Sequence, residues 1–215
     1  MRSAWNCYRG HSLDSKIDFS VSSGALVWLA ILLLLLPLEW VIALLLAMCV
    51  HECAHAVAIC LTGGSIHGVH IGGTGTVLVS QPMSGMKEGI CAIAGPIGSL
   101  LLLLLIRWMP RTAICGAVHG LYNLIPLIPL DGGRILRCIV DKLFSPPRAG
   151  RVFSGLQIVI RVAIAALCIL ASARIGILTL VFGFLLLRRQ RNENPLAKSP
   201  FWRYNNRSID KGVQL

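Results

Sequence analysis

A pair of histidines one helical turn apart lies inside a stretch of almost wholly apolar residues that runs from about Trp40 to Leu61. The pair is His51 and His55, in the sequence His-Glu-Cys-Ala-His, which also contains Glu52. On a helix both imidazoles lie on one face, so both can bind one metal ion, and the adjacent carboxylate can take a proton from water. Ionisable side chains are costly at membrane depth and are seldom kept there without a function. The motif therefore predicts a membrane bundle of helices with polar chemistry in its interior.

The composition assigns the chain to the integral membrane proteins. Of the 215 residues, 55% are hydrophobic and 13% are charged, and the mean hydropathy of +0.74 is far above that of soluble domains. We expect an all-α membrane protein with a cytoplasmic N-terminal segment over residues 1–20, a transmembrane domain over 21–190 and a basic cytoplasmic tail over 191–215. The first apolar run leads directly into further membrane sequence, so we expect it to be retained rather than cleaved as a signal peptide.

Six apolar runs in the sequence have close to the ~20 residues that cross the hydrocarbon core. The first two are separated only by a short segment around Pro37, which predicts a tight helical hairpin. An alternative for residues 21–61 is one long span plus a shallow segment. The six runs cover about residues 21–38, 40–61, 89–108, 112–130, 153–171 and 175–187.

The positive charges provide an independent test of the topology. With six crossings and a cytoplasmic N-terminus, sixteen of the twenty lysines and arginines lie on the inner side and three on the outer side, while Arg161 falls within a span. The positive-inside rule therefore favours two cytoplasmic termini. The net charge of +11 then reflects topology and attraction to the anionic headgroups of the lipid bilayer. We expect no nucleic-acid binding, because no compact basic domain is available for it.

The eight cysteines form no CxxC pair and show no regular spacing. Most of them lie within the predicted spans, where cysteine acts as a small apolar residue, so we expect no disulfide framework. Cys49 and Cys53 flank the histidine pair at helical spacing. A thiolate ligand from one of them is an alternative, although buried cysteine is most often inert packing.

Two histidines leave a catalytic zinc site one protein ligand short. Among the scarce acidic residues Asp131 is the best candidate, because it ends the fourth span in the run Asn-Leu-Ile-Pro-Leu-Ile-Pro-Leu-Asp-Gly-Gly-Arg. Pro126 and Pro129 break the helix, and such backbone survives at membrane depth only inside protein or beside a watery cavity. A straight helix would carry Asp131 to the inner edge of the bilayer, so the site requires the chain to unwind and hold it higher. Gly132 and Gly133 allow a sharp turn there with close approach of the backbone, and we expect the site nearer the cytoplasmic face.

Together, the motifs at residues 51–55 and 123–133 resemble HExxH and NxxPxxPLDGG, the signature motifs of the site-2 protease family of intramembrane zinc metalloproteases. The resemblance covers about residues 21–190 and is greatest to the compact six-span bacterial branch that includes the sporulation pro-sigma-factor processing protease. It implies that His51, His55 and Asp131 bind one Zn²⁺ and that Glu52 is the general base. It also implies a bacterial cell-membrane location, a membrane-anchored or membrane-associated protein substrate, a role in regulated signalling, and control by partner membrane proteins. The sequence does not indicate the oligomeric state.

Two weaker matches accompany these motifs. Residues 94–99 resemble a family stretch in the third span, but Ser99 stands where asparagine is common, which leaves the polar role of that position unsupported. Residues 66–80 are rich in Gly, Thr, Val and Ile, and they resemble a membrane-associated β-hairpin of the family. An exposed strand edge there could pair with an extended substrate. A plain loop is the alternative. In either case we expect His67 and His70 to be side chains on the surface of this segment.

Three further residues are candidates for substrate binding or for support of an oxyanion: Asn123, Pro129 and His119. His119 lies one turn before Asn123, on the same helix face. A buried histidine that bonds a backbone carbonyl is an equally good interpretation of His119. The segment from Arg134 to Leu143 is amphipathic, which predicts a helix on the inner membrane surface.

Two functions of other classes remain open. A metal or ion transporter also places His, Glu and Asp in a bundle, but it would usually show repeated broken helices, and the sequence has one. A catalytically inactive membrane scaffold is the other alternative, and the presence of the predicted base and of all three predicted ligands argues against it. Metal flux without proteolysis would favour the transporter, whereas zinc content compared with an Asp131→Ala variant tests the metal site.

Overall fold

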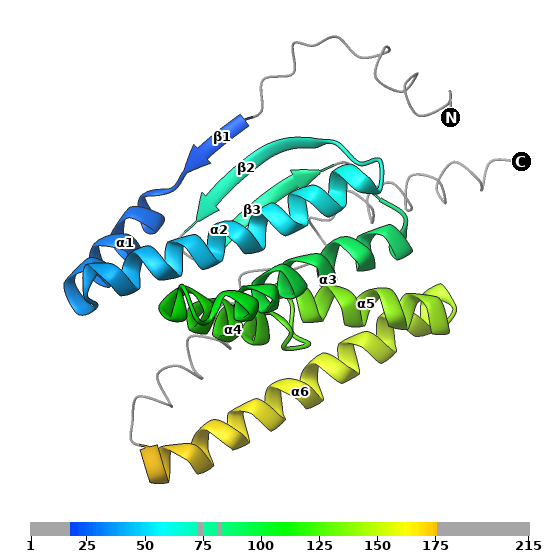
Figure 1. Cartoon of the computed structure of the whole chain (residues 1–215). Coiled ribbons are helices and arrows are strands. Elements are labelled where there is room, and N and C mark those ends of the chain that lie inside the picture. The colour runs from blue at the N-terminus through cyan, green and yellow to red at the C-terminus, as the bar shows by residue number, and fades with distance from the viewer. Residues whose placement is uncertain (1–17, 73–74, 81–82, 176–215) are drawn as a thin grey trace, which may run out of the picture.

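The computed structural model describes residues 18–72, 75–80 and 83–175 of the chain (Figure 1). The predicted N-terminal segment up to residue 17, the sixth span after Ile175 and the basic tail lie outside the described residues. The elements follow in the order β1 (Asp18–Val21), α1 (Ser23–Leu35), α2 (Leu38–Leu61), β2 (Ile66–Gly72), β3 (Gly75–Ser80), α3 (Gly85–Leu101), the 3-10 helix η2 (Leu102–Leu105), α4 (Pro110–Asn123), α5 (Asp131–Leu143) and α6 (Pro146–Ile175).

Three helices in the described ranges are long and apolar enough to cross a bilayer, namely α2, α3 continued by η2, and α6. The helix α1 has 13 residues, or ~20 Å at ~1.5 Å per residue, which is less than the ~30 Å hydrocarbon core. The helix α4 has 14 residues. Large apolar side chains of these three helices are exposed, among them Leu46, Ile97 and Val159, as contact with lipid requires. A helical membrane protein is therefore supported, while the count of six crossings stays a prediction.

The predicted hairpin between the first two apolar runs is present, with a shorter first arm. The side chain of Ser22 accepts a hydrogen bond from the Ala25 amide at 3.3 Å, which caps the start of α1. At the other end, Leu36 is extended, as a residue before proline prefers, and Pro37 precedes α2. These two local signals limit α1 to fewer residues than the predicted range of 21–38.

The chain breaks after α4, at the two prolines. The fourth apolar run was predicted to span the membrane as far as residue 130, but α4 ends at Asn123 and residues 124–130 are not helical. Pro126 and Pro129 lack the N–H groups that a continuing helix would use, and their rings clash with the preceding turn. The segment 124–130, named the proline loop below, therefore replaces the last two turns of the predicted span.

The helix α5 begins at Asp131, three residues before the start predicted from its amphipathic pattern. Gly132 and Gly133 consequently lie in its first turn rather than in a separate sharp turn, whereas the close backbone approach predicted for them is confirmed. A Cβ built on Gly132 would lie 2.1 Å from the carbonyl oxygen of Leu124, and one on Gly133 would also collide with the backbone of the proline loop. Glycine at both positions lets α5 pack directly against that loop.

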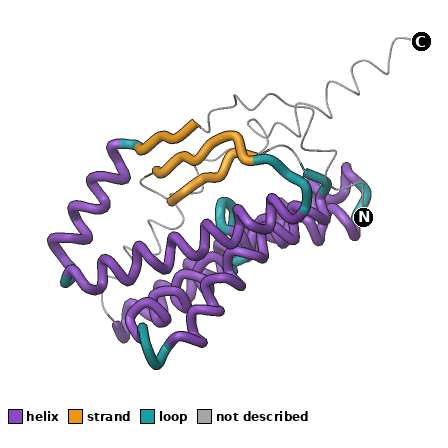
Figure 2. Tube along the Cα trace, turned by 45° about the horizontal axis from the view of Figure 1, so that its top comes forward, coloured by secondary structure: helices purple, strands orange, loops and turns teal. Residues whose placement is uncertain are grey.

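Three strands form a small sheet in the order β1-β2-β3, with β1 parallel and β3 antiparallel to β2. The register pairs Ile66 with Ser80 and Gly72 with Gly75, so residues 66–80 contain two paired strands rather than a plain loop. The strand β1 was not predicted. The sheet lies beside α2, on the side away from α6 (Figures 1 and 2). Its association with the membrane stays a prediction.

Small residues bring α2, α3 and α4 close together. Ala47 of α2, Ala92 of α3 and Ala113 of α4 are fully buried, and a Cβ added to Gly98 of α3 would lie 2.5 Å from the Cβ of Ala54. Membrane helices commonly pack through such small residues, because these allow the backbones to approach. The close packing places the histidine-bearing face of α2 against α3 and α4, and Asp131 at the start of α5 reaches the same face.

Candidate metal centre

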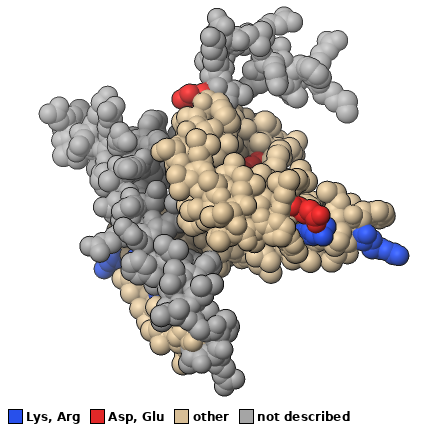
Figure 3. Space-filling view, turned by 90° about the vertical axis from the view of Figure 1, so that its left-hand side faces the viewer, with Lys and Arg blue, Asp and Glu red and all other residues tan. Residues whose placement is uncertain are grey.

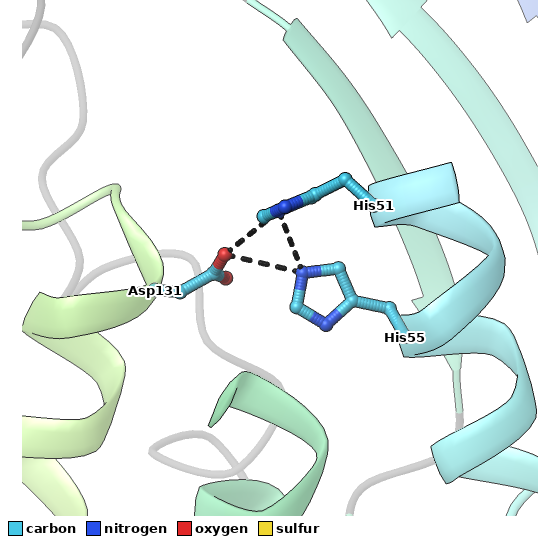
Figure 4. A group of neighbouring side chains, drawn as sticks. All are labelled: His51, His55 and Asp131. Atoms are coloured by element: carbon cyan, nitrogen blue, oxygen red, sulfur yellow. Dashed lines mark hydrogen bonds and ion pairs between the residues drawn. The ribbon is translucent and has the colours of Figure 1, made fainter. Parts of the chain in front are cut away.

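His51, His55 and Asp131 converge in the interior of the bundle, although the aspartate is more than seventy residues from either histidine (Figure 4). The Oδ2 atom of Asp131 lies 3.1 Å from the Nε2 atom of each histidine, and the two Nε2 atoms are 3.1 Å apart. The residues are 2%, 8% and 7% exposed, respectively. Among the described residues, these three form the group whose His, Cys, Asp or Glu donors are placed to hold a metal ion.

Hydrogen bonds from α3 orient both imidazoles. The Nδ1 atom of His55 donates to the carbonyl oxygen of Cys91 at 2.7 Å, which fixes the proton on Nδ1 and leaves the Nε2 lone pair free. The Nδ1 atom of His51 lies 2.8 Å from Oγ of Ser99, which can accept its proton in the same way. Metal-binding histidines are typically held by such a bond to the second ring nitrogen. Both Nε2 atoms are thereby aimed at the same point.

Gly95 makes room for the two rings. A Cβ built on Gly95 would lie 2.2 Å from Nε2 of His55 and 2.8 Å from Nε2 of His51. Separations below 3.0 Å are not found for real Cβ atoms, so any side chain here would displace the imidazoles. Glycine at position 95 of α3 is therefore required for the two imidazole rings to occupy these positions.

Asp131 reaches the histidines because the proline loop ends there and α5 begins. Its second oxygen, Oδ1, lies 3.8 Å from Arg134 of the same helix, and Arg134 lies 3.8 Å from Glu88 of α3. One carboxylate oxygen therefore faces the histidines while the other faces a cation. Arg134 therefore lies between the carboxylates of Asp131 and Glu88 and links α5 to α3 through two ion pairs.

The three donors fit zinc. Ligand atoms around a tetrahedral zinc ion with bonds of ~2.1 Å are ~3.4 Å apart, close to the 3.1 Å separations between the three donor atoms. Two imidazole nitrogens and one carboxylate oxygen suit zinc chemically, and a set of three protein ligands leaves a fourth position for water or substrate. That arrangement is typical of catalytic rather than structural zinc.

Glu52, the predicted base, follows His51 directly on α2 and is partly buried. Its carboxylate interacts electrostatically with both histidines and with Asp131. The other glutamate of α2, Glu39, lies at the far end of the helix in an exposed ion pair with Arg111, at 2.7 Å. The two glutamates of one helix thus stand in different environments, and only Glu52 stands beside the three donors.

His119, Asn123 and Pro129 lie around the site rather than in the cluster. The His119 ring is edge-on to the His51 ring, with centroids 4.6 Å apart. The side-chain amide of Asn123 donates to Nε2 and to the backbone oxygen of His119, each at 3.1 Å. Pro129 lies in the proline loop, two residues before Asp131. Substrate or oxyanion roles for these residues stay predictions.

A cavity of about 410 Å³ adjoins His119 between α2 and α4. Its wall is mostly apolar, and His119 is the residue through which it meets the histidine pair. Figure 3 shows a hollow in the protein surface with an acidic group inside it. The cavity is lined by Trp40, Leu44, Ile114, Cys115, Val118, His119 and Tyr122.

The cysteines do not join the donor group. Cys49 and Cys53 are exposed, and their Sγ atoms lie 4.0 Å from one another. On α5, burial and the nearby Glu88 carboxylate raise the pKa of the Cys138 thiol to about 11. A thiol in that state is a poor ligand, because metals bind the thiolate. The thiolate alternative concerned Cys49 and Cys53, and neither belongs to the group of donors found among the described residues, which is His51, His55 and Asp131.

Sequence reasoning missed three residues that support the donors. Ser99 was noted only as a departure from the asparagine common in the family, yet it bonds His51. Arg134 was assigned to a surface helix, yet it faces Asp131. Gln157 is a buried polar residue of α6 that bonds the proline loop. Its signal was available, because a glutamine inside a predicted membrane span is unusual and points to a specific partner.

A buried pair of histidines with an aspartate and an adjacent glutamate, held in a bundle of apolar helices, defines the class of membrane-embedded metalloproteases. The chain belongs to the peptidase M50B-like family, whose model matches residues 24–130. Its fold is similar to that of the site-2 protease from Methanocaldococcus jannaschii, with a TM-score of 0.58, 19% identity, and coverage of 84% of this chain and 93% of that one. No curated protein sequence matches the chain significantly.

Proposed function

We propose that the protein is an intramembrane zinc endopeptidase that cleaves a membrane-anchored or membrane-associated protein. The observation that carries the proposal is the convergence of His51, His55 and Asp131 beside Glu52, inside an apolar bundle. Family membership supplies the metalloprotease class, and the donor set supports zinc as the metal. No observation on the described residues favours a transporter or an inactive scaffold.

His51, His55 and Asp131 would hold the zinc ion in this site. When bound, zinc supplies a Lewis acid that polarises a peptide carbonyl and lowers the pKa of water. Glu52 accepts a proton from the attacking water and delivers it to the leaving nitrogen, since it is the carboxylate beside the donors. The Cys91 carbonyl and the Ser99 hydroxyl keep the two imidazoles oriented by bonding the Nδ1 atoms of the histidines. The surrounding apolar helices limit the access of bulk water.

The substrate must present an extended backbone, because helical peptide bonds are shielded by their own hydrogen bonds. The sheet β1-β2-β3 beside α2 supports pairing of an extended substrate at a strand edge. The uneven distribution of lysine and arginine supports cytoplasmic termini. The depth of the two motifs along their predicted spans supports a site nearer the cytoplasmic face, and a location in the bacterial cell membrane follows from the family resemblance. Regulated signalling, including sporulation, and control by partner membrane proteins follow from the family resemblance alone.

The proposal is tested by Glu52→Gln, which removes the base and keeps the shape of the side chain. In cells that co-express single-span candidate substrates, the wild-type protein should yield a cleaved product and the Glu52→Gln variant should yield none while keeping its zinc. Glu39→Gln is the matched control, because it makes the same change in the same helix at an exposed ion pair, and it should cleave normally. Normal cleavage by the Glu52→Gln variant would refute the assignment of the base, and metal flux without any cleavage would favour a transporter.

A further inference from the structure

One side of α6 is buried, whereas most of this helix is exposed. Ala149, Phe153 and Gln157 follow each other at intervals of four residues and are 1%, 6% and 4% exposed. The neighbouring residues Ile158 and Val159 are 58% and 64% exposed. Ala149 and Phe153 pack in an apolar cluster with α5. Gln157 extends this buried stripe with a polar group, which is costly in an apolar setting unless its hydrogen bonds are made.

Both ends of the Gln157 amide bond the backbone of the proline loop. Its Nε2 atom donates to the carbonyl oxygen of Pro126 at 2.9 Å, and its Oε1 atom accepts from the amide of Ile128 at 3.3 Å. A broken helix leaves such carbonyl and amide groups without their regular partners, and at membrane depth this costs several kcal/mol per group. The side chain of Gln157 thus satisfies a donor and an acceptor that the prolines have released.

The loop that Gln157 holds leads directly to the metal centre. Ile128 lies three residues before Asp131, and the intervening Leu130 is tied back to the Leu127 carbonyl by a 2.8 Å hydrogen bond. The absence of side chains at Gly132 and Gly133 lets α5 contact the same loop backbone. A displacement of the loop would therefore move Asp131, whose Oδ2 atom must stay in line with two fixed imidazoles.

We propose that Gln157 is a positioning residue that holds the proline loop, and through it Asp131, in the geometry that binds the metal. The inference rests on the metal centre of the proposed function. Metal affinity and the docking of α6 are then linked, so each should strengthen the other. Gln157 touches neither metal nor substrate in this account, and its effect travels through backbone atoms of the loop alone.

The test compares Gln157→Met with the wild-type protein, purified in detergent. Methionine has a similar length and volume but cannot replace the two hydrogen bonds. We expect the zinc dissociation constant, measured by competition with a chelator, to rise ~10–100-fold, the range found when residues behind metal ligands are altered. Hydrogen exchange of the Ile128 amide, which donates to Gln157, should accelerate in the same variant. Excess zinc should restore cleavage.

Two control variants separate the hydrogen bonds from general packing. Ile158→Met places the same residue at the next position, on the exposed side of α6, and should leave zinc affinity unchanged. Phe153→Leu weakens the apolar cluster between α5 and α6, one helical turn from Gln157, but keeps both hydrogen bonds of Gln157. We expect this variant to have a lower thermal stability and less than a threefold change in zinc affinity. An equal loss of affinity in Phe153→Leu and Gln157→Met would overturn the role of the hydrogen bonds.

The outcomes for the two proposals are distinguishable. If wild-type protein binds zinc and Gln157→Met binds it equally well, the role of Gln157 is wrong and the metal centre stands. If wild-type protein binds no zinc, the proposed function itself fails. Should Gln157→Met not fold, Gln157→Asn provides the second variant, because it keeps an amide but is one methylene shorter, so it cannot reach both the Pro126 carbonyl and the Ile128 amide. A partial loss of affinity is then expected, and wild-type affinity would overturn the proposal.

Discussion

Gly95→Ala adds one methyl group to α3, a helix that supplies no metal ligand, and we expect it to prevent metal binding. A Cβ at this position would lie 2.2 Å from Nε2 of His55. An ordinary contact needs at least 3.4 Å, so the ring would have to retreat by about 1.2 Å. Zinc–ligand distances vary by only ~0.2 Å between sites, so a shift of this size removes the bond. The other side of the ring is tied to Cys91 by a 2.7 Å hydrogen bond, which restricts adjustment.

The expected effect is a loss of zinc with a small effect on folding. Displacing a ligand should cost more than the ~10–100-fold typical of residues behind the ligands, so we expect at least ~100-fold weaker zinc binding. Overpacking costs about 1–3 kcal/mol of folding stability, and the better helix propensity of alanine offsets up to ~1 kcal/mol of it. The assay is zinc per chain after dialysis against a chelator, followed by thermal unfolding.

Gly89→Ala on the same helix is the matched control. Its Cβ would lie 3.5 Å from the Cβ of Cys138, an ordinary contact, so zinc content should be unchanged and stability equal or slightly higher. A Gly95→Ala protein that retains one zinc per chain with wild-type affinity would refute the reasoning, because it would mean that the ion is not bound between the two imidazoles.

Three further substitutions have expected outcomes. Ser99→Ala removes the partner of Nδ1 of His51 and should weaken zinc binding ~10–100-fold, as measured by chelator competition, with little change in thermal unfolding. Gly132→Ala would put a Cβ 2.1 Å from the Leu124 carbonyl oxygen and should lower both zinc content and the unfolding temperature, since two backbones cannot separate without moving Asp131. Glu39→Gln removes an exposed ion pair and should change the free energy of unfolding by less than about 1 kcal/mol, as measured by denaturant titration.

Local patterns predicted the part of the site that lies on one helix. His51 and His55 share a face because the α-helix repeats every 3.6 residues, and this holds whatever the surrounding fold. The broken helix before Asp131 also follows from local chemistry, since two prolines remove backbone donors wherever they stand. The sequence therefore predicted that an irregular segment leads to the aspartate and lets it reach the histidines; the structure places Asp131 at the start of α5, directly after that segment, and brings the three side chains together.

Contacts that depend on how helices cross could not be predicted in this way. The carbonyl of Cys91 and the hydroxyl of Ser99 meet the histidines only because small residues let α3 approach α2 closely. The short strand β1 has no periodic pattern of its own, and it forms because β2 offers a parallel edge. The length of α1 was overestimated because an apolar run marks lipid exposure, whereas the Ser22 cap and Pro37 set where the helix begins and ends.

X-ray absorption at the zinc edge of the purified wild-type protein tests the central claim most directly. We predict one zinc ion per chain, with two imidazole nitrogens and otherwise oxygen donors in its coordination shell. The signal of the aspartate oxygen should be lost together with most of the zinc in Asp131→Ala. A sulfur donor in the shell, or a full complement of zinc in Asp131→Ala, would contradict the assignment of His51, His55 and Asp131 as the ligands.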